Sequence, residues 1–325
     1  MSNLEVGIVG LPNVGKSTLF NAITKAGAEA ANYPFCTIEP NVGVVDVPDE
    51  RLKVLHEMYN SKKTTPASVS FVDIAGLVKG ASRGEGLGNK FLSHIRQVDA
   101  VAHVVRCFAS GDITHVEGSV DPIRDIEIIN TELCLADLDS VEKRLDRVSR
   151  TAKSGNKEAR AEEAVLEKVK KVVEEAIPAR QAELSEDELE LIKDLNLLTL
   201  KPTLYVANVS EDEAATAEND NEYVAKVKEY AQKENAGVVV ISAKVESEIA
   251  ELDEEEANEF LSDLGLDESG LNKLIKAAFK LLGLMTFLTA GEDECRAWTI
   301  KVVQKLHRLP VKFTLNIETL ASISC

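Results

Sequence analysis

The stretch Gly10–Ser17, with the sequence GLPNVGKS, decides the fold of this chain. It follows an apolar run, Val6–Val9, and leads into the helical pattern of Lys16–Ala26. A strand, a glycine-rich turn and a helix start, in this order, are the context that a phosphate-binding loop requires. Gly10 and Gly15 let backbone N–H groups converge on anionic oxygens without a Cβ in the way. The stretch therefore predicts a site for nucleotide phosphates, with an ordinary glycine-rich turn as the alternative.

The side chains and amides of this loop have separate predicted roles. Lys16 would reach the β- and γ-phosphates and stabilise the charge that develops during hydrolysis, so it is the first catalytic candidate. The Ser17 hydroxyl would bind Mg²⁺, and the helix N-terminus behind it would add partial positive charge. The other predicted nucleotide contacts within the loop and helix start are Asn13, Val14, Gly15 and Thr18.

Short β-branched runs alternate with helical stretches through the first 106 residues and return after Pro202. This alternation predicts an α/β fold with a mostly parallel, doubly wound sheet. Ligands of such sheets bind at the carboxyl ends of the strands, where the Gly10 loop falls. The expected strands are Val6–Val9, Val42–Val47, Val69–Ile74, Ala100–Val105, Thr203–Val209 and Gly237–Ser242.

A helical insertion interrupts this pattern. Apolar residues recur at helical spacing in Ile123–Arg150 and Asn156–Ile177, with a Ser-Gly-Asn breaker between them. We expect an antiparallel helical hairpin, followed by a short helix that Ser185 starts with a capping box. The predicted domains are a nucleotide-binding domain (1–122 and 200–284), the inserted hairpin (123–199) and a C-terminal segment (285–325).

Composition and charge restrict the function. The 325 residues carry a net charge of −18, which argues against a protein that simply coats nucleic acid. The hairpin is an exception, because residues 143–171 contain ten Lys or Arg and five Asp or Glu. One face could therefore meet an anionic partner. The chain has no apolar run long enough for a bilayer, no signal sequence and no metal-type spacing of its five cysteines, so we expect a cytoplasmic protein, without membrane contact and monomeric.

Two further segments fit a site for a nucleotide with Mg²⁺. Asp73 ends the third predicted strand, where its carboxylate can hold the metal through water, and the Gly76 N–H can meet the γ-phosphate. Thr37 lies in a loop with two prolines, where a switch segment supplies a second hydroxyl to the metal. A plain turn at Asp73 and a structural role for Thr37 are the alternatives.

The segment after the strand Thr203–Val209 predicts the base. GTPases place Asn-Lys-x-Asp here, and this chain has Asn208-Val209-Ser210-Glu211. Adenine has no N1–H to give a carboxylate, whereas an Asn side chain can pair with its N6 and N7. The departure favours ATP over GTP, and Ser242 and Ala243 would add backbone contacts to the base. A GTPase with a degenerate base motif remains the alternative.

The residue that positions the attacking water is less evident. Many GTPases carry Gln after D-x-x-G, and here Leu77 stands at that position. His115, in a segment flanked by glycines, is our catalytic candidate, with a surface histidine of no role as the alternative. For His94 and His103 we expect packing roles.

Together, these motifs resemble those of the YchF-type Obg-like ATPases, a branch of the translation-factor-related P-loop NTPases. The resemblance runs from the N-terminus to about Lys301. It implies a nucleotide domain, an inserted helical hairpin and a C-terminal ubiquitin-like TGS domain. It also implies hydrolysis of ATP in preference to GTP, a hydrophobic residue in place of the catalytic Gln, and association with the ribosome or its large subunit.

The C-terminus departs from that family pattern. Residues 286–291 and 296–301 look like the entry into a TGS domain, but no match continues from Val302 to Cys325. We expect an incomplete or altered TGS-like segment, since about 24 residues are too few for an independent domain.

A nucleotide-gated ribosome-binding module with negligible turnover is the alternative function from another class.

Overall fold

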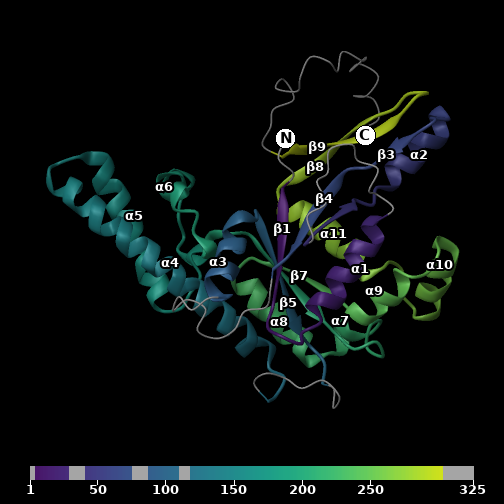
Figure 1. The fold of residues 1–325 in the computed structure, drawn as a ribbon, viewed down its shortest axis with the longest axis horizontal. Helices are drawn as coiled ribbons and strands as arrows, with labels where there is room; N and C mark the ends of the chain where they lie inside the picture. Colours follow the sequence, from purple (N-terminus) through teal and green to yellow (C-terminus); the bar gives the residue numbers. More distant parts are fainter. Residues whose placement is uncertain (1–3, 29–40, 75–86, 110–117, 303–325) are drawn as a thin grey trace.

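The computed structural model describes residues 4–28, 41–74, 87–109 and 118–302. Its centre is a six-stranded sheet with the strand order β2-β4-β1-β5-β6-β7 (Figure 1). β2 runs antiparallel to β4, and the other neighbouring pairs are parallel. The predicted mostly parallel sheet is therefore confirmed. Its strands are β1 (Glu5–Val9), β2 (Val42–Asp46), β4 (Ser68–Asp73), β5 (Ala100–Arg106), β6 (Thr203–Asn208) and β7 (Gly237–Ile241).

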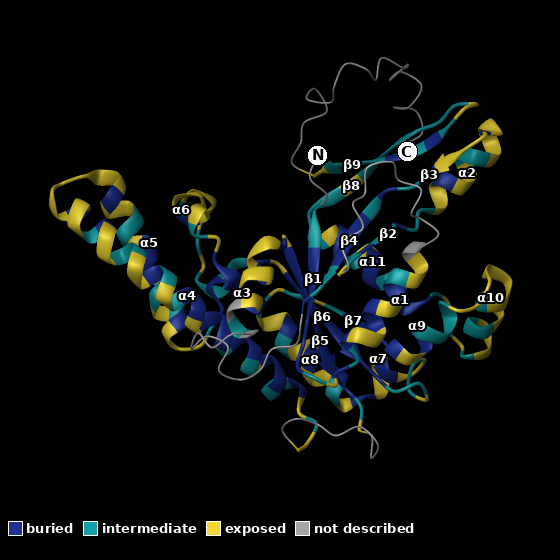
Figure 2. Ribbon diagram, in the orientation of Figure 1, coloured by how far each residue is buried: buried dark blue, intermediate teal, exposed yellow. Residues whose placement is uncertain are grey.

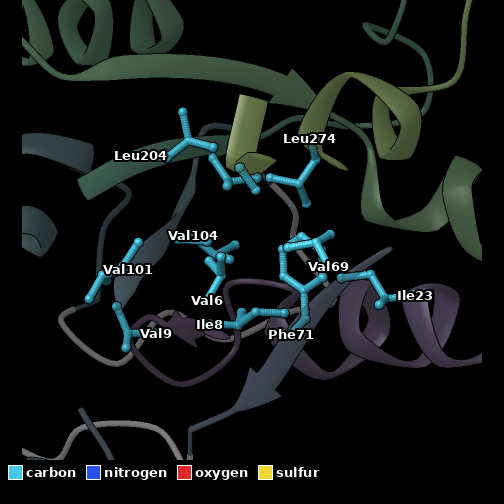
Figure 3. Close-up of a cluster of buried hydrophobic side chains, with 14 of the residues drawn as sticks. Val6, Ile8, Val9, Ile23, Val69, Phe71, Val101, Val104, Leu204 and Leu274 are labelled. Carbon is cyan, nitrogen blue, oxygen red and sulfur yellow. The ribbon is translucent and has the colours of Figure 1, made fainter. Parts of the chain in front are cut away.

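The sheet is buried on both faces, as β6 illustrates. Leu204 and Val206 belong to a hydrophobic cluster that includes α1 (Lys16–Ala28) and α11 (Gly270–Leu281). Tyr205 and Ala207 belong to another, shared with α8 (Glu222–Lys233) and with Ile126 near the start of α4 (Pro122–Lys153). Successive side chains of a strand point to opposite faces, so a continuous apolar run fits a sheet covered by helices on both sides. Figure 2 shows the buried central strands, and Figure 3 shows the first cluster.

The inserted hairpin consists of α4 (Pro122–Lys153) and α5 (Lys157–Glu174), which project from the sheet (Figure 1). Asp121 caps α4 by accepting hydrogen bonds from the N–H groups of Ile123 and Arg124. The predicted breaker separates the arms, and Gly155 adopts φ +93° there, a conformation that favours glycine. The arms bury their own hydrophobic cluster, which explains how they extend so far from the sheet. The domain boundaries stay a prediction.

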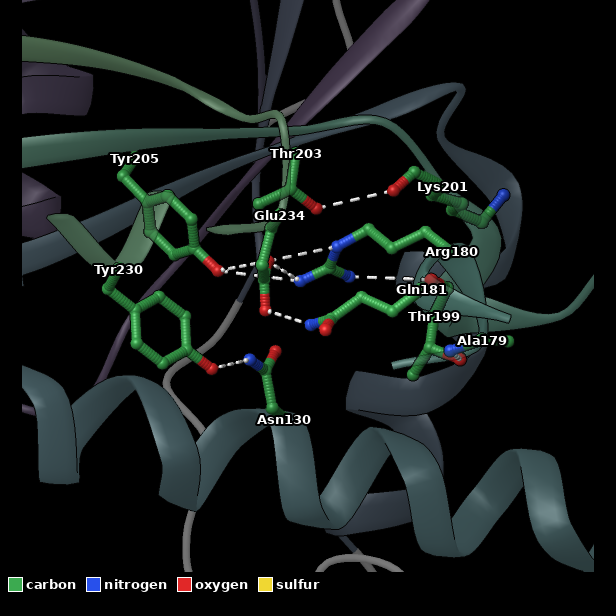
Figure 4. A network of polar contacts seen from close by, with 10 residues as sticks. All are labelled: Asn130, Ala179, Arg180, Gln181, Thr199, Lys201, Thr203, Tyr205, Tyr230 and Glu234. Carbon is green, nitrogen blue, oxygen red and sulfur yellow. Dashed lines mark hydrogen bonds and ion pairs between the residues drawn. The ribbon is translucent and has the colours of Figure 1, made fainter. Parts of the chain in front are cut away.

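A buried polar network attaches the hairpin to the nucleotide domain (Figure 4). After α5, the short helix η2 (Ala179–Gln181) brings Arg180 to Glu234, which follows α8, with 2.6 Å between Nη2 and Oε2. Tyr205 of β6 donates its hydroxyl to the same carboxylate oxygen at 2.9 Å. Further along α4, Asp137 accepts from the backbone N–H groups of Leu198 and Thr199 at 2.8 Å each. The insertion is therefore held through α4 and also through the segment that follows α5.

The C-terminal part of the described chain forms a second sheet with the order β3-β9-β8. β8 (Leu284–Thr289) pairs antiparallel with β9 (Cys295–Lys301), and β3 (Thr64–Thr65) pairs parallel with β9. The helix α2 (Glu50–Tyr59) lies beside β9. Residues 303–325 lie outside the described residues, so the predicted incomplete TGS-like segment stays a prediction.

The remaining helices show where local prediction succeeded and failed. α6 (Glu186–Ile192) begins with the predicted capping box of Ser185 and Glu188. The acidic stretch after β6 contains the short helix α7 (Ala217–Asp220). The sequence analysis did not predict the two helices that follow β7, α9 (Ala243–Ile249) and α10 (Glu254–Asp263). The helix α3 (Leu87–Gln97) lies before β5, where the alternating pattern of strands and helices predicts a helix.

Two histidines test the expected packing roles. His103 of β5 is buried, with its ring centroid 5.5 Å from that of Tyr205, and burial lowers its pKa to about 3. Its packing role is confirmed. His94 is exposed on α3, so the prediction for that residue is wrong. Within the described ranges, no helix is both long enough and apolar enough to cross a membrane.

Candidate nucleotide-binding site

The phosphate loop connects β1 to α1, as the sequence predicted. Asn13 and Gly15 have φ angles of +62° and +93°, which turn the backbone sharply before α1 begins at Lys16. A Cβ on Gly15 would lie 2.2 Å from Nδ2 of Asn208, and one on Gly10 would lie 2.7 Å from the Val104 carbonyl oxygen. Both glycines are therefore required by close approach, and Gly15 also by its φ. The N-terminus of α1 and its orphan N–H groups face this loop.

Lys16 and Asp73 meet at the carboxyl ends of β1 and β4. The ammonium nitrogen of Lys16 lies 3.0 Å from Oδ1 of Asp73, and their side chains are 10% and 24% exposed. Adjacent parallel pairing of β1 with β4 places Ile8 beside Asp73, so the sheet register brings the two residues together. The predicted phosphate-binding cation and the predicted metal-side carboxylate thus converge on one place. Ser17 and Thr18 are exposed in the first turn of α1.

Asn208, at the end of β6, ties three segments together. Its Nδ2 donates to the Val14 carbonyl at 2.8 Å, and its Oδ1 accepts from the Ala243 N–H at 2.9 Å. The residue is 3% exposed. The predicted pairing of Asn208 with N6 and N7 of adenine would have to share these two atoms. The first function of this side chain is therefore to join the phosphate loop to the loop that would contact the base.

The other predicted base residues lie around this tie. Val209 is buried and donates its N–H to the Ile241 carbonyl at 2.9 Å, so it closes the end of β6 onto β7. The Ser242 hydroxyl caps α9 by accepting from the Val245 N–H, and Ala243 begins that helix. Glu211 forms an exposed ion pair with Lys244, which raises the pKa of that lysine.

Part of the predicted site lies outside the described residues, namely Thr37, Gly76 and His115, together with Leu77. Their roles stay predictions.

Two buried charged residues were missed by the sequence analysis, one at the amino end of β6 and one in the helix that follows β7. Lys201, just before β6, donates to the carbonyls of Arg96 and Val98 at 3.1 and 2.6 Å and so holds the C-terminal end of α3. Glu246, in α9, accepts backbone hydrogen bonds from the start of α11. Neither role leaves a local signal, because the partners of each side chain are distant backbone groups.

A phosphate loop with a carboxylate at one neighbouring strand end, and a base-side asparagine at another, defines a nucleotide-binding protein of the P-loop NTPase class. Residues 5–136 match the family model described as 50S ribosome-binding GTPase. The chain is 64% identical over 298 residues to the ribosome-binding ATPase YchF of Bacillus subtilis strain 168, covering 92% of this chain and 81% of that protein. The identity to the protein of the same name in Escherichia coli O157:H7 is 58%, with the same coverage.

A solved structure gives the same assignment. The YchF GTPase of Schizosaccharomyces pombe superposes with a TM-score of 0.81 at 44% sequence identity, covering 93% of this chain and 82% of that one. The chain belongs to the YchF family, as the resemblance in the sequence indicated.

Proposed function

We propose that this protein binds and hydrolyses ATP with Mg²⁺ and acts as a nucleotide-dependent switch on the ribosome. The observation that carries the proposal is the convergence of Lys16 and Asp73 at the phosphate loop, 3.0 Å apart. Relatives named ribosome-binding ATPase support the activity and the partner. A ribosome-bound protein of this kind would work in the cytoplasm, and we propose that it acts as a monomer.

The residues of the proposed nucleotide site have separate roles. Lys16 and the loop amides would hold the β- and γ-phosphates and stabilise the charge that develops on them in the transition state. Asn208 would keep the phosphate loop and the base loop in register, and Ser242 and Ala243 would present backbone groups to the base. The Gly76 N–H would respond to the γ-phosphate, and His115 is the candidate that positions the attacking water.

The donor set suits Mg²⁺. The ion prefers oxygen ligands, and the Ser17 hydroxyl and the Asp73 carboxylate supply oxygens at one end of the site. Thr37 would supply a second hydroxyl, and Asp73 would act through water. The metal, when bound, would neutralise phosphate charge.

The choice of base needs a direct test, because the names of the relatives differ. Two are named ATPases, whereas the solved relative and the family model are named GTPases. Val209 supports ATP, since a buried valine cannot lie along a guanine ring as the lysine of Asn-Lys-x-Asp does. Dissociation constants of ATP and GTP, measured by titration calorimetry with Mg²⁺, should favour ATP. Equal or tighter GTP binding would instead support an Obg-like GTPase with a degenerate base motif.

The hairpin tip is our candidate ribosome contact. Arg147, Arg150 and Lys153 are exposed there, and none of them forms an ion pair within the part of the chain that the structure describes. Nearer the sheet, Arg144 pairs with Glu162 and Lys170 with Glu142. The unpaired cations at the tip would meet phosphates of ribosomal RNA.

Charge reversal tests this contact. Arg147, Arg150 and Lys153 changed together to Glu should weaken binding to ribosomes and to large subunits in a sedimentation assay, most strongly at low salt. The matched control reverses the exposed lysines of α8, Lys226, Lys228 and Lys233, which changes the net charge equally. Unchanged binding by the tip variant at low salt, or equal loss in the control, would reject the hairpin contact.

Turnover decides between a hydrolytic switch and a nucleotide-gated binding module. Leu77 stands where many GTPases carry a catalytic Gln, which motivates the second reading. Phosphate release with and without ribosomes should show turnover that ribosomes accelerate and that His115→Ala reduces. Negligible release in both conditions, with nucleotide-dependent ribosome binding intact, would favour the module.

A further inference from the structure

The base half of the site depends on where Ala243 lies. Its backbone N–H donates to Oδ1 of Asn208 at 2.9 Å, and Nδ2 of Asn208 holds the Val14 carbonyl at 2.8 Å. If Ala243 were displaced, the hydrogen bond to Oδ1 of Asn208 would be lost first. Nδ2 of Asn208 would keep its hydrogen bond to the Val14 carbonyl in the phosphate loop. The base loop can therefore be disturbed separately from the phosphate loop.

Glu246 lies three residues after Ala243, and therefore on the same side of α9, one turn on. Its two carboxylate oxygens accept from the N–H groups of Gly270 and Leu271, at 2.8 and 3.1 Å. These are the first two residues of α11, whose N–H groups have no partner within their own helix. The residue is 3% exposed, so the contact is removed from water.

The contact is more than a helix cap. Ser269 already caps α11 by accepting from the Asn272 N–H at 3.1 Å. Glu246 adds a link from another helix, 24 residues earlier in the chain. Gly270 permits the approach, because a Cβ there would lie 2.8 Å from Cγ1 of Ile241 and 3.1 Å from Oε1 of Glu246.

The second helix of this link is firmly placed. α11 packs on β6 and β7 and contributes Leu271, Leu274 and Ile275 to the main hydrophobic cluster. Burial raises the pKa of the Glu246 carboxyl, while the two N–H groups lower it. A buried carboxylate held by two amides at the positive end of a helix is a directional contact. α9 is thus anchored to the sheet through α11.

We propose that Glu246 is a positioning residue for nucleobase recognition: by fixing α9 to the start of α11, it holds Ala243 where Asn208 and the base require it. The proposal rests on the proposed ATP binding. It assigns Glu246 no contact with the nucleotide. Its loss should weaken binding of the base and leave binding of the phosphates nearly unchanged.

The test compares ATP with inorganic tripolyphosphate, which has no base, in titration calorimetry with Mg²⁺. Glu246→Gln keeps the size of the side chain but turns an NH₂ group toward one of the two N–H groups. It should weaken ATP binding about tenfold and tripolyphosphate binding less than about twofold. Glu248→Gln, on the same helix and only partly buried, is the matched control and should change neither.

A second variant guards against misfolding. Glu246→Asp keeps the charge with a shorter reach, and it should give a smaller loss with the same preference for ATP over tripolyphosphate. Equal losses for both ligands, or unchanged ATP binding in either folded variant, would overturn the role of Glu246. Failure of the wild-type protein to bind ATP would overturn the proposed function itself and this role with it.

Discussion

Glu234 offers the sharpest test of how the helical insertion is held. Its carboxylate accepts four hydrogen bonds: Arg180 Nε at 3.1 Å, Arg180 Nη2 at 2.6 Å, Gln181 Nε2 at 2.9 Å and Tyr205 OH at 2.9 Å (Figure 4). The side chains of Glu234 and Arg180 are 2% and 13% exposed. Glu234→Ala would leave the buried guanidinium without its counter-charge. We expect a loss of about 3–5 kcal/mol in the free energy of unfolding.

Urea unfolding followed by far-ultraviolet circular dichroism measures this loss, because the network joins α8 to the helices of the insertion. The control is Glu229→Ala, within α8, whose ion pair with Lys233 leaves both side chains 70% exposed. The control should lose at most about 0.5 kcal/mol. Removing both charges with Arg180→Met and Glu234→Leu should recover at least about 2 kcal/mol relative to Glu234→Ala. A single variant within about 1 kcal/mol of wild type, or a double variant without recovery, would refute the reasoning.

Three further predictions concern His103, Gly15 and Lys201. Burial lowers the pKa of His103 to about 3, so below about pH 6.5 the unfolded chain binds a proton at this residue that the folded chain does not bind. The free energy of unfolding should therefore be largest above about pH 6.5 and fall as the pH is lowered. Between pH 6 and 5 the loss should be about 1 kcal/mol. His103→Phe should flatten this slope in urea titrations, and an unaltered slope would contradict the assignment. Gly15→Ala should weaken ATP binding at least about tenfold in calorimetry, because its Cβ would meet Asn208 at 2.2 Å and φ is +93°; wild-type affinity would show that the loop can relax. Lys201→Met should lower the melting temperature by several degrees, as about 2 kcal/mol is lost with its bonds to the end of α3, and unchanged melting would refute that role.

Local signals in the sequence predicted much of the fold. The phosphate loop, the capping box at Ser185 and the breaker at Gly155 depend on residues within a few positions of one another, and the structure contains all three. The helices α9 and α10 were missed, although Asp253 and Glu256 form a capping box at the start of α10. Their stretch reads as an acidic run, because α10 buries none of its residues and α9 has only seven, so neither shows a clear apolar period.

Only the tertiary structure shows which groups far apart in the chain form hydrogen bonds with one another. The sequence indicated a phosphate loop and a base segment, but not that Asn208 donates to the Val14 carbonyl, 194 positions away. It also gave no sign that Glu246 receives the first N–H groups of α11. The physical reason is the same in both cases. A backbone donor or acceptor is chemically alike at every residue, so the pattern of side chains carries no mark of which distant backbone group a buried polar side chain will satisfy.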